Sequence, residues 1–277
     1  MTRTFNIVVC WQLAPIQQKD QEMTTLVVGA SGATGRLLVQ QLLARGEHVR
    51  IIVRSTESLP DEITNHDKLS VFQASVLDLS DNRLAQCVSD CGAVASCLGH
   101  NMSFKGLFGP PRRLVTDATR RLCSAIKANK PDKPVKFVLM NTAGNINRDV
   151  GEQISLGEKC VIGLLRLFLP PHADNEHAAD YLRTQIGQND EVIQWAAVRP
   201  DTLIDEAGTS SFEAHASPTR SAIFDPGKTS RINVGCFMAD LISDDEVWNK
   251  WKGKMPVIYN KPFETELAKY EAESKHW

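Results

Sequence analysis

Residues 26–38 read LVVGASGATGRLL, and the fold is decided within this stretch. An apolar run is followed by Gly29, Gly32 and Gly35 and then by helix-forming residues. A buried strand that passes through a glycine turn into a helix is suited to binding a diphosphate, because the helix begins with free N–H groups and a partial positive charge. The stretch therefore predicts a phosphate-binding turn.

The glycines of such a turn have separate tasks. The first permits a sharp bend, the second lets the backbone approach the phosphates, and the third lets the helix pack on the strand. The spacing G-x-x-G-x-x-G departs from the dinucleotide fingerprint G-x-G-x-x-G, so the complete strand-helix-strand unit around it strengthens the prediction. The expected cofactor contacts in the turn are Gly29, Ser31, Gly32, Ala33, Thr34 and Gly35.

Two further places along the chain are expected to meet a nucleotide. Arg54 ends the next apolar run, where a protein that prefers NAD has an acidic residue, and a guanidinium there favours a 2′-phosphate and hence NADP(H). The alternative is a solvated arginine at a strand end. After the third apolar run, Asp78 and the backbone of Leu79 are placed to meet the adenine, although Asp78 or Ser80 fits equally well as a helix cap.

Apolar runs alternate with helical patterns from Thr24 onward. This alternation predicts an α/β fold of the Rossmann type, a doubly wound parallel sheet with helices on both faces. The apolar runs are continuous, as expected for strands buried on both faces. Helices are predicted over about 80–88, 111–129 and 174–186, and small substrate-side insertions over 99–110, 143–173 and 201–230.

The chain is predicted to form one domain over residues 23–260, because no repeat, low-complexity tract or Gly/Ser linker divides it. Residues 1–22 are expected to be an extension outside the fold, since their apolar centre is too short and too interrupted for a secretory signal or a membrane span. Met23 would then serve as an alternative start. Residues 261–277 are charged and predict a solvated helix or a frayed end.

Composition and charge exclude several classes of partner. A formal net charge of −2 and a pI near 6.4 provide no basic field for nucleic acid or for an anionic membrane, so neither is expected as a partner. The seven cysteines are odd in number and contain no C-x-x-C pair, which predicts reduced thiols and a cytoplasmic protein. The expected partner is a small-molecule substrate.

Five blocks of the sequence resemble successive parts of the atypical short-chain dehydrogenase/reductases, above all the NAD(P)H-binding, NmrA-like branch that includes biliverdin-IXβ and flavin reductase-like proteins. The resemblance spans roughly residues 24–260 and implies a Rossmann fold that binds NADP(H) at the carboxyl ends of the strands, with the substrate above the nicotinamide. The blocks are TLVVGASGATGRLLVQQLLARGEHVRIIVRS (25–55), VLDLSD (76–81), VKFVLMNTAG (135–144), ADYLRTQIGQNDEVIQWAAVRPDTLID (179–205) and TSRINVGCFMADLI (229–242).

The sequence departs from this family at the residues that commonly transfer the proton. Short-chain dehydrogenases use a Tyr-x-x-x-Lys pair, in which lysine makes tyrosine a better acid or base. The usual serine after the fifth strand is replaced here by Asn141-Thr142. Reduction driven by a tyrosine is therefore not expected, because the residue pairs at that spacing are Tyr181–Gln185, Tyr259–Phe263 and Tyr270–Ser274.

Other side chains are then needed near the reacting atoms. Ligands of open α/β sheets bind at strand carboxyl ends, which brings the backbone of Leu98 and Gly99 to the cofactor and Asn141 and Thr142 to the substrate. These two side chains are predicted to orient the substrate. His177 is predicted to supply a proton as hydride arrives, because imidazole titrates near neutral pH.

The residues around His177 allow a simpler interpretation as well. Asp174 or Asn175 fits as the cap of the helix, with His177 on the wet face. No metal site is expected, because the spacing of five between His172 and His177 takes them off one helical face.

Three functions fit this set of residues. The first is an NADPH-dependent oxidoreductase that reduces a conjugated flavin-, quinone- or tetrapyrrole-like molecule, with solvent able to supply the proton. The second is a non-catalytic NmrA-like regulator that senses NADP(H) and binds a protein partner. The third, disfavoured by the missing Tyr-x-x-x-Lys pair, is a nucleotide-sugar epimerase or dehydratase.

The apolar run at 161–171 is expected either to line a pocket for a flat ligand or to form a core helix around Arg166.

Overall fold

The computed structural model describes residues 24–101 and 103–261, so the predicted extension at 1–22 and nearly all of the predicted tail lie outside the described residues. Within these described residues, ten strands form two sheets: β1 (Thr24–Val28), β2 (His48–Val53), β3 (Leu69–Gln73), β4 (Cys91–Ser96), β5 (Val135–Met140), β6 (Ile193–Pro200), β7 (Thr202–Ile204), β8 (Phe212–His215), β9 (Lys228–Ser230) and β10 (Val257–Asn260).

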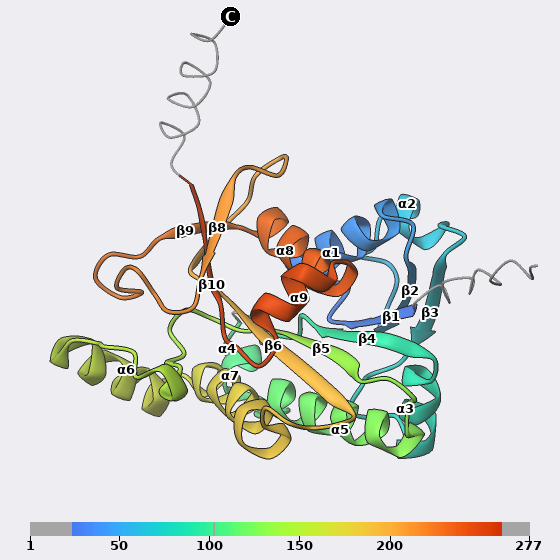
Figure 1. The fold of residues 1–277 in the computed structure, drawn as a ribbon, viewed down its shortest axis with the longest axis horizontal. Coiled ribbons are helices and arrows are strands. Elements are labelled where there is room, and N and C mark those ends of the chain that lie inside the picture. The colour runs from blue at the N-terminus through green and yellow to red at the C-terminus, as the bar shows by residue number, and fades with distance from the viewer. Residues whose placement is uncertain (1–23, 102, 262–277) are drawn as a thin grey trace, which may run out of the picture.

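The large sheet has the order β3-β2-β1-β4-β5-β6-β10-β8 (Figure 1). Its strands pair in parallel except for β8, which runs antiparallel to β10 at one edge. The order reverses direction between β1 and β4, which creates the switch point at which this kind of sheet binds ligands. The predicted doubly wound α/β sheet is confirmed, and β7 pairs with β9 separately beside it.

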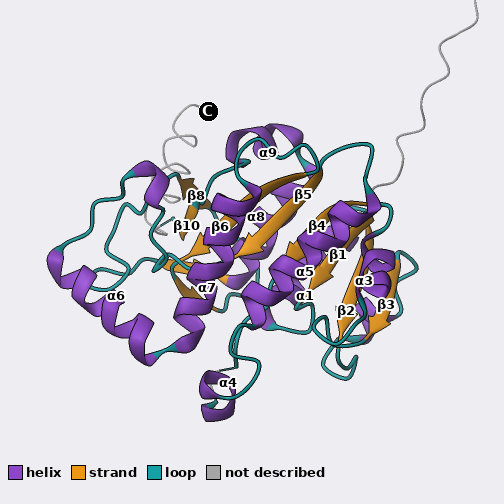
Figure 2. Cartoon of the chain, turned by 90° about the horizontal axis from the view of Figure 1, so that it is seen from below, coloured by secondary structure: helices purple, strands orange, loops and turns teal. Residues whose placement is uncertain are grey.

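Helices cover both faces of the sheet (Figure 2). One face carries α1 (Ala33–Ala44), α2 (Asp61–Thr64), α8 (Arg231–Ser243) and α9 (Asp245–Trp251), and the other carries α3 (Asp81–Val88), α5 (Leu114–Asn129) and α7 (Pro170–Tyr181). Two more helices, α4 (Phe104–Phe108) and α6 (Leu156–Phe168), belong to the insertions. None of the helices in the described parts of the chain is long and apolar enough to span a membrane.

The sheet separates two apolar cores, because successive side chains of a strand point to opposite faces. In β1, Leu26 and Val28 pack in the core beneath α3 and α5, while Val27 packs in the core beneath α1 and α8. All three are fully buried. The continuous apolar run of the first strand is explained by this burial on two sides.

Two predicted helices begin or end elsewhere. The helix expected over 174–186 begins at Pro170, where proline is tolerated because the first helical N–H needs no partner, and continues after Tyr181 as a π-helical turn over Leu182–Ile186. The helix expected from 111 begins at Leu114.

The insertion helix α6 is not a core helix, and the interpretation of 161–171 as one is wrong. Ile162 and Glu158 are buried, but Leu164 and Leu167 are 56% and 72% exposed and Arg166 is half-exposed. The helix projects from one end of the molecule (Figure 1) and is anchored through one face only. Hydrophobic residues lie on both the buried and the exposed faces of α6. The sequence therefore did not reveal which of them pack against the rest of the protein.

A buried ion pair fastens the second insertion to the sheet. Arg199, at the end of β6, has a fully buried side chain and donates to both carboxylate oxygens of Glu152 at 2.6 and 3.0 Å. Its remaining N–H groups reach the carbonyl oxygens of Asn145 and Met255, each at 2.7 Å. A charge without contact to water is tolerated here because each of its donors has an acceptor.

Replacing Arg199 with methionine should therefore lower the free energy of unfolding by about 3 kcal/mol, because Glu152 would remain buried without its partner. Urea denaturation measures this difference. Arg231→Met is the matched control: it breaks a pair with Asp205, whose side chain is 83% exposed, and should cost less than about 1 kcal/mol. Equal losses in the two variants would contradict the assigned role of the buried pair.

Candidate functional site

The glycine turn after β1 is built from two positions that exclude a side chain. Gly29 has φ +77°, and a Cβ there would lie 2.5 Å from the backbone of Cys97 at the end of β4. A Cβ on Gly35 would lie 2.2 Å from the carbonyl oxygen of Gly29. These two glycines bring β1, the start of α1 and the end of β4 into direct contact.

The start of α1 is open to a ligand. Its N-cap residue, Gly32, offers no capping side chain, and Gly32, Ser31 and Ala33 are all exposed. The first N–H groups of a helix have no intrahelical partner, so an anion held there would be bound by free donors at the positive end of the helix dipole. Thr34 and Gly35 follow as buried residues that pack the helix on the sheet.

Arg54 follows β2 at the same carboxyl edge and is exposed. Its carbonyl oxygen accepts a hydrogen bond of 3.3 Å from Gln73, while its guanidinium group has no partner among the residues that the structure describes. This position leaves the charge available to a phosphate, and the choice between phosphate ligand and solvated arginine stays a prediction.

The loop after β3 resolves the question of the helix cap. Ser80 is the N-cap of α3 and accepts a hydrogen bond of 3.3 Å from the N–H of Arg83. Asp78 is exposed and does not cap the helix, so its carboxylate remains available for the predicted contact with adenine.

Arg121 on α5 fixes this loop through its guanidinium group, a contact that no motif in the sequence indicates. Its guanidinium group donates to the carbonyl oxygens of Val76 and Leu77 at 3.0 and 2.5 Å and to the carbonyl oxygen of Leu79. It also reaches Asp81 at 3.0 Å. An arginine in a helix gives no sequence signal for partners more than 40 residues away in the chain.

The end of β4 carries Leu98 and Gly99 past the glycine turn. The N–H of Cys97 donates to the carbonyl oxygen of Val28 at 2.9 Å, so β4 continues beside β1 up to the turn. Gly99 is exposed and a Cβ on it would meet no atom within 4 Å. The structure therefore brings the predicted contacts Leu98 and Gly99 together with Gly29.

His100, the next residue, is locked into a buried polar cluster. Its Nε2 lies 2.8 Å from Oδ2 of Asp174, and its Nδ1 lies 3.2 Å from the carbonyl oxygen of Gly106. Asp174 also accepts from the N–H groups of Val115 and Thr116 at 2.8 and 3.0 Å. Asp174 is thus the cap of α5 and not of its own helix, and the interpretation of it as a local cap is wrong.

The end of β5 is organised by the amide of Asn141. Its Nδ2 donates to the carbonyl oxygen of Asn175 at 2.9 Å, and its Oδ1 accepts from the N–H of Thr142 at 2.9 Å and from Asn145 at 3.2 Å. Thr142 is half-buried, and its hydroxyl oxygen accepts from the N–H of Gly144 at 3.3 Å. Asn141 fixes the strand end, and the hydroxyl hydrogen of Thr142 remains free to donate.

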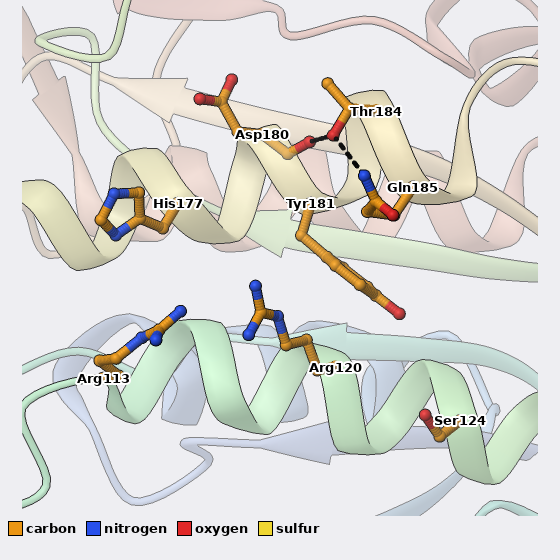
Figure 3. Close-up of a pocket in the computed structure, with 8 residues that line it drawn as sticks. All are labelled: Arg113, Arg120, Ser124, His177, Asp180, Tyr181, Thr184 and Gln185. Carbon is orange, nitrogen blue, oxygen red and sulfur yellow. Dashed lines mark hydrogen bonds between the residues drawn. The ribbon is translucent and has the colours of Figure 1, made fainter.

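His177 lies away from these residues. It is exposed on α7 and lines a groove between α5 and α7 together with Tyr181 (Figure 3). The lining residues of this groove include none of the predicted cofactor contacts. His172, Asp174 and His177 do not converge either, because Asp174 binds His100 and His172 faces Glu176. The catalytic role of His177 stays a prediction.

A cavity of about 240 Å³ begins where β5 ends. Its walls come from the second and third insertions and include Ile162 on the inner face of α6, as the pocket-wall interpretation of that segment expects. Glu158 accepts from Ser221 at 2.5 Å and from Ser155, and these hydrogen bonds lower the pKa of Glu158. The lining residues are Ala143, Gly144, Ile146, Glu152, Gln153, Ile154, Glu158, Ile162, Ser217, Pro218, Thr219, Arg220, Ser221, Ala222 and Ile223.

Known proteins match this chain in fold and in family. A family model described as NAD(P)H-binding matches residues 29–245. No curated protein matches the sequence at a significant level. The chain is similar to solved structures over most of its length, at identities below 20% that show the shared fold alone.

Three of these structures illustrate the similarity. A short-chain dehydrogenase/reductase from Veillonella parvula in complex with NADP has 18% identity and a TM-score of 0.62, over 87% of this chain and 95% of that chain. ChuY, an anaerobillin reductase from Escherichia coli O157:H7, has 16% identity and a TM-score of 0.60, over 87% and 100%. A Streptococcus pneumoniae protein put forward as an NADH-flavin reductase has 16% identity and a TM-score of 0.58, over 86% and 100%.

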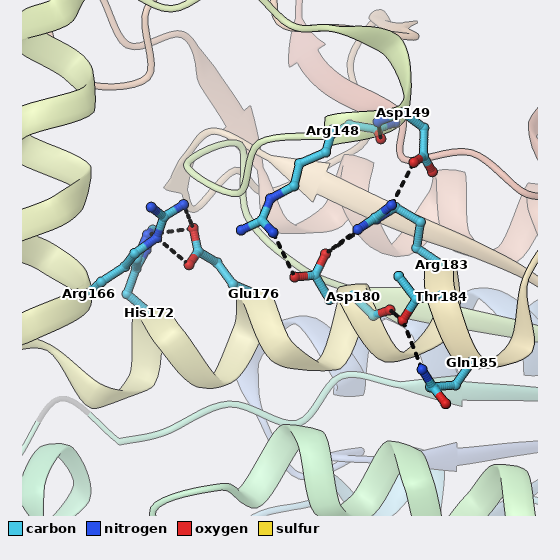
Figure 4. Close-up of polar contacts among 10 residues, drawn as sticks. Arg148, Asp149, Arg166, His172, Glu176, Asp180, Arg183, Thr184 and Gln185 are labelled. Atoms are coloured by element: carbon cyan, nitrogen blue, oxygen red, sulfur yellow. Dashed lines mark hydrogen bonds and ion pairs between the residues drawn. The ribbon is translucent and has the colours of Figure 1, made fainter.

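Near the cavity, Glu176 on α7 bridges two basic side chains (Figure 4). Arg166 donates to its carboxylate at 2.6 and 2.9 Å, and Nε2 of His172 lies 3.4 Å from Oε1. Burial alone raises the pKa of Glu176, but the contacts with His172 and Arg166 outweigh it and lower the pKa to about 2. The charged form of Glu176 is therefore the one that these contacts between α6 and α7 favour.

Stability should accordingly fall with acid. A carboxyl group whose pKa drops from 4.5 to about 2 on folding stabilises the fold above pH 4.5, and this contribution is lost as the pH falls toward 2. Urea midpoints of the wild type should therefore decrease through this range more steeply than those of Glu176→Gln. Glu191→Gln, at an exposed position, is the control and should keep the wild-type slope. Parallel curves for the wild type and Glu176→Gln would contradict this assignment.

Proposed function

Because this chain belongs to the NAD(P)H-binding family, we propose that it is an NADPH-dependent oxidoreductase that reduces a flat, conjugated small molecule. The observation that carries the proposal is that the open glycine turn and the ends of β4 and β5 lie at one edge of the sheet, where Ala143, the residue after Thr142, lines a cavity. Cofactor and acceptor would meet at one edge of the sheet, as hydride transfer requires.

NADP(H) is proposed as the cofactor, in preference to NAD(H), because of Arg54. Its guanidinium group is exposed at the end of β2, and the acidic residue that binds the ribose hydroxyls of NAD is missing there. The complex of the Veillonella protein with NADP supports this choice by similarity of fold. The adenine would lie between Arg54 and the loop that carries Asp78 and Leu79.

Substitution of Arg54 tests this specificity. Arg54→Gln should weaken NADPH binding about tenfold or more, because charge-assisted hydrogen bonds to the 2′-phosphate are lost, and should leave NADH binding within about twofold. Fluorescence titration of both dinucleotides measures the effect. Arg45→Gln, beyond the end of α1, is the matched control and should change neither affinity. A wild type that binds NADH more tightly than NADPH would overturn the assignment.

In the proposed reaction, the residues of the chain bind and orient. NADPH supplies the hydride when bound. The start of α1 holds its diphosphate, and the backbone of Leu98 and Gly99 passes beside it. Thr142 has a free hydroxyl hydrogen to donate to the acceptor, and Asn141 holds the strand end in place. The proton reaches a conjugated ring from solvent, so no Tyr-x-x-x-Lys pair is required.

The proposed acceptor follows from the lining of the cavity. Four isoleucines, two alanines and a proline give the lining its apolar part, and two serines, a threonine, a glutamine, two glutamates and Arg220 give its polar part. Such a mixture suits a planar ring system with polar substituents. The anaerobillin reductase and the proposed flavin reductase among the similar structures act, by their names, on molecules of this kind.

The turnover test is NADPH oxidation with flavins, quinones, a linear tetrapyrrole and aldehydes as acceptors. We expect oxidation with at least one conjugated acceptor and none with simple aldehydes. Ile162→Trp fills the cavity and should lower kcat/KM at least about tenfold with an unchanged affinity for NADPH. Leu164→Trp, on the exposed face of the same helix, is the control and should behave as the wild type.

Loss of turnover in His177→Ala with intact NADPH binding would support the predicted role of His177.

One observation favours the second function, an NADP(H)-sensing regulator that binds a protein partner. Leu156, Leu164, Leu167 and Phe168 on α6 are 56–80% exposed, and Phe224, next to Gly157, is 63% exposed. Several large exposed apolar side chains on one helix favour a surface that binds another protein. Tight NADPH binding without oxidation by any acceptor in the panel would favour the regulator over the reductase.

A further inference from the structure

The groove between α5 and α7 is a second concave surface, separate from the predicted cofactor contacts. It has a volume of about 500 Å³ and lies between two helices that cover the same face of the sheet (Figure 3). This volume falls within the range of about 300–1,000 Å³ typical of small-molecule sites. The lining residues are Arg113, Arg120 and Ser124 from α5 and the residue that precedes it, and His177, Asp180, Tyr181, Thr184 and Gln185 from α7 and its π-helical extension.

Two guanidinium groups enter the groove without an acidic partner. Figure 3 shows Arg113 and Arg120 pointing from the α5 side toward α7. Within the described residues, Arg113 makes no ion pair or side-chain hydrogen bond, and Arg120 contacts only the ring of Tyr181, with its guanidinium carbon 5.5 Å from the ring centroid. The imidazole of His177 is exposed beside them.

The acidic side chains nearby do not neutralise these arginines. Asp180 lines the groove, but its carboxylate turns to the other side of α7, where Arg183 binds it at 3.2 Å and Arg148 at 3.7 Å (Figure 4). Asp117 lies on α5 between the two arginines, yet it is not part of the lining and forms no ion pair with either of them. The groove therefore keeps an excess of positive charge.

We propose that this groove binds a small organic anion that carries two acidic groups. Arg120 lies on α5 and Arg113 is the residue immediately before it, and both line the same groove. Guanidinium groups bind the oxygens of carboxylates and phosphates through paired hydrogen bonds. The hydroxyl groups of Ser124 and Thr184 would meet the neutral end of the ligand. This site does not depend on the proposed reductase activity.

The test uses two probes, tripolyphosphate and the dicarboxylate suberate, titrated calorimetrically into the whole protein at low and at physiological ionic strength. We expect saturable binding of at least one probe, weaker at higher salt. Arg113→Gln combined with Arg120→Gln should weaken binding at least about tenfold. Arg112→Gln removes one positive charge at a residue outside the lining of the groove, half the change of the double variant, and should stay within about twofold of the wild type.

NADPH titration of the same variants separates this proposal from the proposed function. Unchanged NADPH affinity in the double variant, with loss of probe binding, would support the groove as an independent site. Absence of saturable probe binding to the wild type, or equal losses in Arg112→Gln and the double variant, would overturn it. A groove covered by a second copy of the chain would also overturn it, and sedimentation velocity would show this as a dimer that the double variant dissociates.

Discussion

The absence of two side chains in the glycine turn is the constraint on which the rest of the structure depends. A Cβ at Gly29 would collide with the backbone at the end of β4. A Cβ at Gly35 would collide with the backbone of the turn from which α1 starts. Because these contacts involve backbone atoms, no shift of a flexible side chain relieves them. They fix the position of the open helix end relative to the ends of the neighbouring strands.

The helices on the opposite face hold the loops of the cofactor edge. Arg121 on α5 binds the carbonyl oxygens of the loop after β3, and Asp174 on α7 binds both His100 and the first N–H groups of α5. Arg121 thus satisfies several carbonyl groups of one loop, while Asp174 joins the side chain of the loop residue His100 to the start of α5. Loops without regular hydrogen bonding need such partners, because buried or half-buried polar atoms without them are costly.

Polar contacts fasten the second and third insertions to the sheet and to each other. Arg199 with Glu152 fastens the second insertion to β6, and Glu158 with Ser221 connects that insertion to the third. Both pairs lie next to the cavity, and Glu152, Glu158 and Ser221 belong to its lining. The position of these parts of the cavity wall is thereby set by contacts between segments that are distant in sequence.

The sequence alone determined those features of this protein that depend on residues close to one another along the chain. Glycine spacing, continuous apolar runs and their alternation with helical patterns indicated the Rossmann-type sheet, the open turn and the family, because each depends on neighbours along the chain. Only the tertiary structure decided that Asp174 caps α5 and that Arg121 holds the loop of Asp78. It also placed His177 in the groove between α5 and α7 and left Leu167 uncovered. Those outcomes depend on partners brought together from distant segments, and no spacing within one segment specifies such a partner.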